Sequence, residues 1–272
     1  MKRIFYFEND ISLEFEKKSP ARITMHTLAN LVKYALKEKP LVGRLQERQV
    51  VQRVINQIKP QNFKNSKGIS TDGIEIAQVL YGTDADDIDP EALNNQLGFM
   101  RKSLEVPTKE GVSLLSLKDA RLLKKQSVIY MTGNSEFLLG IEETKNLRNF
   151  LKNGGFLFAD SACSCEEFNK SFSELMKKLY PHAKLELIPL DNPVYQEPFR
   201  HSMSFTRELQ NEHDEKKPFL LGIRQDDRYV VIYSPLDFSS ALANKLDNDS
   251  KGIKSPAAFR LVTNIISYGL SY

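Results

Sequence analysis

Short apolar runs alternate with amphipathic segments over residues 74–190, and this alternation is the feature that most constrains the fold. The run FLFA at residues 156–159 shows no polar alternation, which is typical of a strand covered on both faces. A helical segment over residues 141–155 precedes this run, and the clearest helical stripe, over residues 164–180, follows it. Strands that alternate with helices predict an α/β fold with an open, mostly parallel sheet and helices on both faces.

The other predicted elements extend this pattern. Helical periods also occupy residues 89–104 and 255–270, and strand-like runs occupy residues 74–81, 126–133 and 183–190. Residues 218–235 are typical of a hairpin that turns at Asp226-Asp227 and adds antiparallel strands to one side of the sheet. Ser164 and Glu167 have the spacing of a capping box, so we expect Ser164 to begin the helix that follows.

Residues 1–68 differ in charge from the rest of the chain. They hold 14 Lys and Arg against 6 Asp and Glu, a net charge of +8, whereas the remainder carries −5. Two helices are predicted over residues 19–58, and a polar linker follows them. We therefore expect a basic helical appendage over residues 1–68 and an α/β domain over residues 69–272. The appendage could be an interaction arm or could dock on the acidic body, and the sequence leaves both interpretations open.

Composition and cysteine content narrow the class of protein. With 41% hydrophobic and 27% charged residues, the chain has the composition of a soluble globular protein. No stretch approaches the roughly 18 apolar residues of a membrane span, and we expect no signal peptide. The two cysteines stand one residue apart, which excludes a disulfide framework and leads us to expect reduced thiols in a cytoplasmic location.

Seven sequence blocks stand in order along residues 69–272. The blocks are GIEIAQVLYG, VIYMTGNSEFLL, LRNFLKNGGFLFADSAC, FNKSF, KLELIPLDNPVY, LLGIRQDDRYVVIYSPLDF and AFRLVTNIISYGL. Together they resemble a bacterial domain-of-unknown-function family that is grouped with the class I glutamine amidotransferase-like superfamily. The resemblance implies a flavodoxin-like fold, in a superfamily that includes both enzymes and catalytically inactive domains. One position departs from the family, because Asn192 stands where we expect a histidine between Asp191 and Pro193.

Ligands of doubly wound sheets bind in the crevice beyond the carboxyl ends of the strands. We expect polar and small residues that follow the predicted strands to form this site, namely Thr132, Gly133, Asn134, Asp160, Ser161 and Asp237, with Cys163 and Ser234 beside them. Asp160 could instead accept hydrogen bonds from backbone N–H groups of its own turn, and Asp237 allows the same two interpretations.

Cys163 is the candidate nucleophile. Ser161 and Cys165, two residues to either side, are small enough for a tight nucleophile elbow, and the N-terminus of the next helix would favour a thiolate. A cysteine nucleophile also needs a general base, and His201 is the histidine whose sequence setting could reach the crevice. The other interpretation of Cys163 is an inert small residue that fills a tight strand-to-helix turn.

These observations favour a non-catalytic domain that binds a ligand or a protein partner at the crevice. The alternative is a cysteine-dependent hydrolase with Cys163 as nucleophile and His201 as base. A third hypothesis is nucleic-acid binding through the basic appendage, where Arg44 and Arg48 share a helix face. We predict no metal and no cofactor, because two cysteines fall short of a zinc site and GNSEFLLG lacks the end of a phosphate loop.

Overall fold

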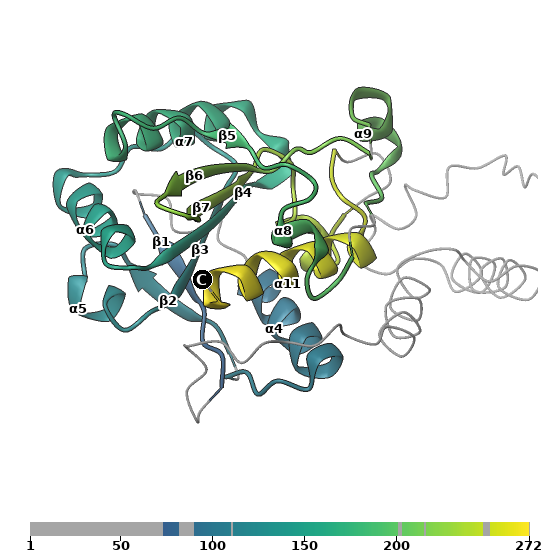
Figure 1. Cartoon of the computed structure of the whole chain (residues 1–272), viewed down its shortest axis with the longest axis horizontal. Helices are drawn as coiled ribbons and strands as arrows, with labels where there is room; N and C mark the ends of the chain where they lie inside the picture. The colour runs from purple at the N-terminus through teal and green to yellow at the C-terminus, as the bar shows by residue number, and fades with distance from the viewer. Residues whose placement is uncertain are drawn as a thin grey trace, which may run out of the picture. The chain divides into compact units, whose positions relative to one another are not determined.

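A seven-stranded sheet organises the part of the chain that this computed structural model describes, residues 73–81, 90–109, 111–200, 203–214, 216–246 and 251–271 (Figure 1). Its order is β2-β1-β3-β4-β7-β6-β5. The strands are β1 (Ala77–Leu80), β2 (Ser113–Ser116), β3 (Val128–Gly133), β4 (Phe156–Ser161), β5 (Glu186–Leu187), β6 (Leu221–Gln225) and β7 (Arg228–Ser234). Neighbours from β2 to β7 pair in parallel, whereas β6 and β5 are antiparallel. The predicted mostly parallel sheet is therefore confirmed.

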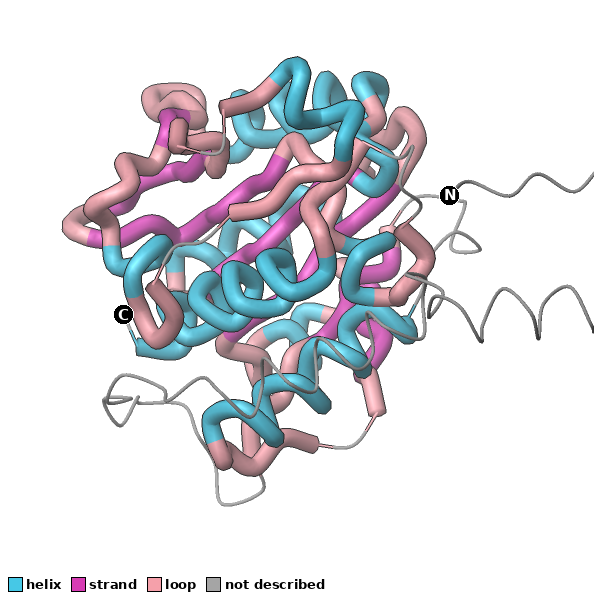
Figure 2. Tube along the Cα trace, turned by 90° about the vertical axis from the view of Figure 1, so that its right-hand side faces the viewer, coloured by secondary structure: helices cyan, strands magenta, loops and turns pink. Residues whose placement is uncertain are grey.

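Helices cover both faces of the sheet (Figure 2). One face packs against α4 (Pro90–Leu104) and α11 (Ser255–Ser271), together with the short helices α8 (Pro193–Gln196) and α10 (Ser239–Leu242). The opposite face packs against α5 (Ala120–Leu123), α6 (Ile141–Lys152) and α7 (Glu166–Leu179). A further short helix, α9 (Arg207–Glu212), follows α8 in the chain. This layered arrangement is that of a flavodoxin-like α/β fold.

The strand β3 shows why the central strands read as continuous apolar runs. Val128 and Tyr130 pack into the core under α4 and α11, whereas Ile129 and Met131 pack into the core under α6 and α7. All four side chains are at most 1% exposed. Successive side chains of a strand point to opposite faces, so a strand covered on both sides is apolar at every position.

The hairpin, the end of α6 and the closing helix follow the sequence prediction. β6 and β7 turn at Asp226 and Asp227, where Asp226 adopts a left-handed φ of 56°. The helix α6 ends at a C-cap Asn153, after which Gly154 adopts a φ of 94° that glycine tolerates best. The closing helix α11 is also confirmed.

Two parts of the sheet differ from the prediction. The strand β2 and the helix α5 that follows it carried no sequence prediction, yet β2 forms one edge of the sheet. The strand predicted over residues 183–190 is wrong in extent, because it shrinks to Glu186–Leu187 at the opposite edge. That segment has a single strand neighbour, β6, and both of its side chains are exposed, so little burial holds it in a regular strand.

The predicted helices over residues 19–58 and the linker after them lie outside the described residues, as does the boundary at residue 68. The basic appendage and nucleic-acid binding through it stay predictions.

Candidate functional site

The carboxyl ends of β3, β4 and β7 meet at one edge of the sheet, which we call the carboxyl edge. Thr132 pairs in register with Asp160, and Asp160 pairs with Ser234. Parallel strands in register place paired side chains on the same face, here the face that packs against α4 and α11. The three residues form a row across the sheet, the polar row, and all three are buried.

Asp160 is fully buried, and its carboxylate accepts three hydrogen bonds. Tyr130 donates its hydroxyl to Oδ1 at 2.5 Å. The backbone N–H groups of Phe238 and Ser239 donate to Oδ2 at 2.9 and 3.0 Å. One interpretation of the sequence had Asp160 accept hydrogen bonds from backbone N–H groups of its own turn. Asp160 does accept such bonds, but their donors lie in the segment after β7. Asp160 therefore ties the end of β4 to the start of α10.

The environment raises the pKa of Asp160 to about 7. Burial is the largest cause, and the negative charge of Asp237 adds to it, because both disfavour the ionised carboxylate. The hydrogen bonds from Tyr130, Phe238 and Ser239 act in the opposite direction and limit the rise. Asp160 can therefore exchange a proton in the neutral pH range, which is unusual for an aspartate.

Asp237 is 1% exposed, and only half of its carboxylate is hydrogen-bonded. Oδ1 accepts hydrogen bonds from the hydroxyl of Ser239 at 3.0 Å and from the N–H of Ser240 at 2.9 Å. Oδ2 is buried and has no hydrogen-bond partner among the described residues. An unsatisfied buried acceptor costs about 1–3 kcal/mol, so the unpaired Oδ2 of Asp237 lowers the stability of the folded protein.

Cys163 lies in a tight turn that immediately follows β4. Cys163 and Ser164 both adopt left-handed conformations, with φ of 55° and 53°, inside the 3-10 turn Ala162–Ser164. Non-glycine residues rarely adopt this conformation, and such strain often accompanies functional sites. The Cys163 side chain is exposed, so the turn presents a thiol at the carboxyl edge.

The surroundings of Cys163 do not activate this thiol. Although the side chain is exposed, partial desolvation of the sulfur by its neighbours raises the pKa of Cys163, and the negative charge of Asp237 raises it further, while a hydrogen bond with Ser240 lowers it. A raised pKa keeps the sulfur protonated at neutral pH, and the protonated thiol is a poor nucleophile.

Two histidines lie among the described residues, and neither is one of the groups that most affect the pKa of Cys163. His182 lies beyond the far end of α7, and 14 helical residues separate the two ends by roughly 20 Å. His213 ends α9, and its ring packs against Phe205. His201, the predicted base, lies outside the described residues.

The predicted capping role of Ser164 is wrong. The N-cap of α7 is Cys165, and Ser164 precedes it in a left-handed conformation that cannot cap a helix. The Ser164 hydroxyl instead donates to the carbonyl of Lys251 at 3.1 Å and accepts a hydrogen bond from the N–H of Asp237 at 3.2 Å. Ser164 therefore links the turn after β4 to the segment after β7.

The structure separates Gly133 and Ser161 from the polar row. The Tyr81 hydroxyl donates to the carbonyl of Thr132 at 2.7 Å and fills the space beside Gly133. A Cβ atom on Gly133 would lie 2.1 Å from that hydroxyl and 2.8 Å from the Phe168 ring, so both rings would have to move. Ser161 donates its hydroxyl to the carbonyl of Cys165 at 3.0 Å. Asn134 is exposed beyond these residues.

Gln78 is a polar residue that the sequence analysis missed. It lies in the middle of β1, is 0% exposed, and pairs in register with Tyr130 of β3. Its Nε2 and Oε1 atoms, like Oγ1 of Thr132, have no hydrogen-bond partner among the described residues. Burial and the Asp160 carboxylate raise the pKa of Tyr130, and the neighbouring Thr132 hydroxyl acts in the opposite direction. The available signal was a glutamine within an otherwise apolar run.

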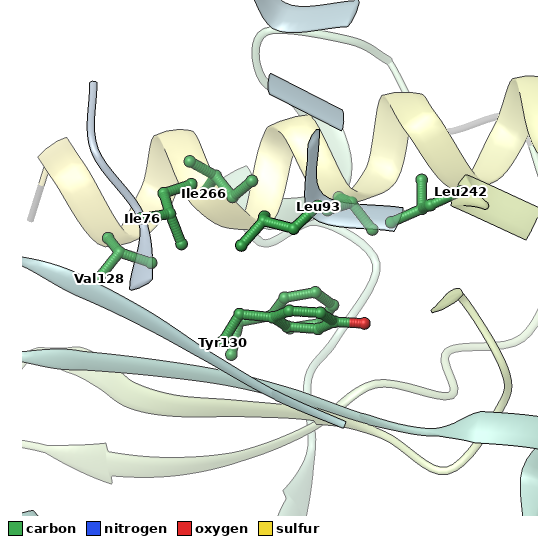
Figure 3. A pocket seen from close by; sticks show the side chains of 8 residues that line it. Ile76, Leu93, Val128, Tyr130, Leu242 and Ile266 are labelled. Carbon is green, nitrogen blue, oxygen red and sulfur yellow. The ribbon is translucent and has the colours of Figure 1, made fainter. Parts of the chain in front are cut away.

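A small apolar cavity of about 10 Å³ lies on the same face, between the ring of Tyr130 and the side chains of Leu93, Leu242 and Ile266 (Figure 3). Its walls are the side chains of Ile76, Leu93, Val128, Tyr130, Phe158, Leu242, Val262 and Ile266. A cavity of this size holds at most one water, and apolar walls offer that water no hydrogen bond. The cavity is therefore a packing defect and not a ligand site.

The described residues contain no cluster of three or more histidine, cysteine, aspartate or glutamate side chains placed to hold a metal ion. Within the same residues, no helix combines the length and apolar character required to traverse a bilayer.

Comparisons with known proteins identify a family whose function is unknown. The chain belongs to the family described as "Domain of unknown function (DUF4159)", whose model matches residues 75–270. No curated protein matches the chain. A crystal structure of a protein described as ThuA-like from Bacteroides uniformis is 13% identical, with a TM-score of 0.37, and the match covers 78% of this chain and 95% of that one.

Asn192, where we expected a histidine, caps α8 by accepting a hydrogen bond from the N–H of Val194 at 3.0 Å.

Proposed function

We propose, for this member of the DUF4159 family, that the carboxyl edge binds a ligand or a segment of a partner protein and does not hydrolyse glutamine. The unpartnered Oδ2 of Asp237 carries this proposal, because it is a buried acceptor beside an exposed turn. A bound molecule that donates a hydrogen bond to Oδ2 would recover the cost of burying that atom. Asp160 and Ser164 support the site by fixing the segment that carries Asp237.

The state of Cys163 favours binding over hydrolysis. An amidotransferase-type nucleophile needs a lowered thiol pKa and an adjacent base, whereas burial and Asp237 raise the pKa of Cys163. The strained turn around Cys163 is the feature that favours the rival hydrolase. We further propose that the domain shares the architecture of the glutamine amidotransferase-like superfamily, which the parallel sheet and the small-residue turn after β4 support.

Thiol reactivity separates the binding protein from the hydrolase. We would treat the Cys165→Ser variant with iodoacetamide at neutral pH and follow modification of Cys163 by mass spectrometry. We expect labelling no faster than that of an unstructured cysteine peptide, because the pKa of Cys163 is raised. Labelling at least tenfold faster, together with ammonia release from glutamine that Cys163→Ser abolishes, would establish the hydrolase.

Ligand binding is tested directly with Asp237→Asn. We would dialyse the protein against a mixture of small polar metabolites and identify retained compounds by mass spectrometry. We expect the wild type to retain at least one compound, and Asp237→Asn to lose about tenfold in affinity for it, since the variant replaces an acceptor with a donor. Asp119→Asn is the matched control, because Asp119 caps α5 in an exposed position. Equal retention by wild type and Asp237→Asn would contradict the proposal, as would retention of nothing by the wild type.

A further inference from the structure

Two neighbouring segments near the β2 edge of the sheet carry an excess of positive charge. Residues 118–125, which contain α5, follow the edge strand β2, and α6 packs beside them (Figure 1). Asn146 on α6 joins the two segments, because its Nδ2 donates to the carbonyls of Leu117 and Lys118 at 2.9 and 3.2 Å. Residues 118–125 and α6 therefore lie side by side, and we call their solvent side the basic surface.

The charge of the basic surface is opposite in sign to that of residues 69–272 as a whole. Residues 118–125 and 141–152 hold seven Lys and Arg against three Asp and Glu, a net charge of +4, whereas residues 69–272 carry −5. Two of the three acidic side chains, Asp119 and Glu143, accept hydrogen bonds from backbone N–H groups at the starts of α5 and α6. The surface therefore presents mainly cations to solvent.

Six of the seven basic side chains are exposed, and none of these six forms an ion pair with a described residue. Exposed lysines elsewhere in the chain do pair, as Lys109 does with Glu75 at 2.6 Å. A group of neighbouring cations without counter-charges creates a positive potential that attracts anions. The six residues are Lys118, Arg121, Lys124, Lys125, Lys145 and Lys152.

Exposed aliphatic side chains lie among these cations. Leu122 on α5 is 43% exposed, and Ile141, the first residue of α6, is 92% exposed. Five large apolar side chains are exposed in the described part of the chain, and three of them, Leu122, Leu138 and Ile141, belong to α5 or to the start of α6. Exposed apolar groups that are rimmed by charges are typical of contacts with a protein or a membrane.

An anionic lipid surface matches both features. Its headgroups offer negative charge to the lysines, and the acyl boundary beneath them accepts aliphatic side chains. A nucleic acid would use the cations, but it would leave Leu122 and Ile141 without a partner, since bases stack on aromatic rings. An acidic peptide would need a groove to lie in, and the cavity beside Leu138 measures only about 10 Å³.

We infer that the basic surface docks on an anionic lipid surface, with its lysines at the headgroups and Leu122 and Ile141 at the acyl boundary. The contact is peripheral, because it uses exposed side chains of two helices that pack on the sheet. Its partner differs from the ligand proposed for the carboxyl edge, so each of the two proposals can hold without the other.

The first test follows sedimentation of the full chain with vesicles. We expect vesicles of phosphatidylcholine with about 30% phosphatidylserine to bind the protein about tenfold more tightly than phosphatidylcholine alone, and less tightly as salt rises. Lys124→Gln with Lys125→Gln should weaken this binding about tenfold. Lys216→Gln with Lys217→Gln is the matched control, because these lysines are also adjacent and exposed but lie between α9 and β6, and it should change binding less than about twofold.

Two results of this test would overturn the inference. One is equal binding to the two kinds of vesicle. The other is an equal effect of the two double variants, whether both weaken binding or neither does, because the contact would then lie outside the basic surface. Urea denaturation of both variants checks that the fold is kept, and we expect no change because all four lysines are exposed.

The second test concerns the aliphatic side chains. Leu122→Ser should weaken binding to the phosphatidylserine vesicles about fivefold. Leu187→Ser is its control, since Leu187 is 57% exposed on β5 at the opposite edge of the sheet, and binding should stay unchanged. Duplex DNA and polyglutamate serve as competing anions. If either binds more tightly than the vesicles, or if Leu122→Ser has no effect, the basic surface does not recognise lipid and the inference fails.

Discussion

The two faces of the sheet are packed in different ways. The face under α6 and α7 is closed by an aromatic cluster, made of Tyr81, Phe137, Phe168, Phe172 and Tyr233. The face under α4 and α11 is equally apolar towards the amino ends of the strands, but at the carboxyl edge it carries Gln78 and the polar row. Both hydroxyls of the aromatic cluster are paired, since Tyr233 donates to Asn169 and Tyr81 to Thr132. Tyr180, which packs on the same face outside the cluster, has an unpaired hydroxyl, and on the opposite face Gln78, Thr132 and Asp237 hold unpaired atoms.

Under the proposed function, this difference predicts separate roles for the two faces. A region that buries large rings with satisfied hydroxyls contributes stability. A region that buries unpaired amides and carboxylates beside a left-handed turn reduces stability, and natural proteins accept such losses mainly at functional sites. The stability of the fold and the binding of a ligand are therefore expected to respond to substitutions on opposite faces.

The largest expected effect lies in the aromatic cluster. Phe172 is fully buried, and its ring stacks on Tyr233 with centroids 4.0 Å apart. We expect Phe172→Ala to lower the free energy of unfolding by about 3–5 kcal/mol, measured by urea denaturation. Leu138→Ala is the control, because Leu138 is 72% exposed and its loss should change the free energy by less than about 0.5 kcal/mol. A loss under about 1 kcal/mol for Phe172→Ala would remove the contrast between the faces.

Asp160, in the polar row, predicts that the free energy of unfolding depends on pH. Its pKa is about 7 in the folded protein and about 3.9 in an unfolded chain. Between these values the unfolded chain has released the proton and the folded protein retains it, so the free energy of unfolding falls as pH rises. The slope approaches about 1.4 kcal/mol per pH unit, below pH 4 the contribution is complete, and above pH 7 no further loss occurs.

Urea denaturation between pH 4 and 8 measures this slope. Asp160→Asn should remove it, because the amide does not titrate, whereas Phe172→Ala should lower the whole curve and keep its slope. A curve for Asp160→Asn that runs parallel to the wild type would show that Asp160 is not the titrating group.

A smaller effect of opposite sign is expected at Thr132. Its Oγ1 atom is buried without a partner, so Thr132→Val should raise the free energy of unfolding by about 1 kcal/mol. Thr263 provides the contrast on the same face, because its hydroxyl donates to the Phe259 carbonyl at 2.8 Å and accepts a hydrogen bond from Gln96. Thr263→Val should lower the free energy by a similar amount. Losses of equal size at both threonines would mean that the polar row is satisfied.

The sequence predicted the central layers of the fold well, because burial on both faces leaves a clear pattern. The first four residues of β3 and of β4 are apolar or aromatic, and α7 shows a regular stripe of buried residues. The outer strands were harder to predict. β2 is four residues long with Leu114 half exposed, and β5 is two residues long, so neither has a distinctive burial pattern.

The candidate site was only partly predictable. That Thr132 and Asp160 would meet follows from two adjacent parallel strands whose polar residues come at their ends. The backbone partners of Asp160 are 78 and 79 residues away in the chain, and no local pattern relates them to Asp160. Ser164 matched a capping box in spacing, but tertiary contacts with Asp237 and Lys251 outweighed that local preference. Whether a buried glutamine such as Gln78 has a partner depends on neighbours that the sequence does not reveal.

The smallest expected effect concerns the turn Ala162–Ser164, which follows the polar row at the end of β4. At a φ of 55°, the left-handed conformation of Cys163 destabilises the folded state by about 1–2 kcal/mol, a penalty that glycine does not have. Glycine in turn loses more conformational entropy on folding, which lowers stability by about 0.5–1 kcal/mol. We therefore expect Cys163→Gly to raise the free energy of unfolding by roughly 0.5 kcal/mol. Ala162→Gly is the control one residue earlier in the same 3-10 turn, at a position without the left-handed φ, and it should lower the free energy.

The pair of variants distinguishes strain from simple flexibility. If both glycines lower the free energy, the turn around Cys163 is held without strain, and the carboxyl edge loses one of its marks of function. If Cys163→Gly raises it, the chain keeps a less stable residue at an exposed position. That result would favour a role for the exposed Cys163 side chain in the binding site proposed at the carboxyl edge.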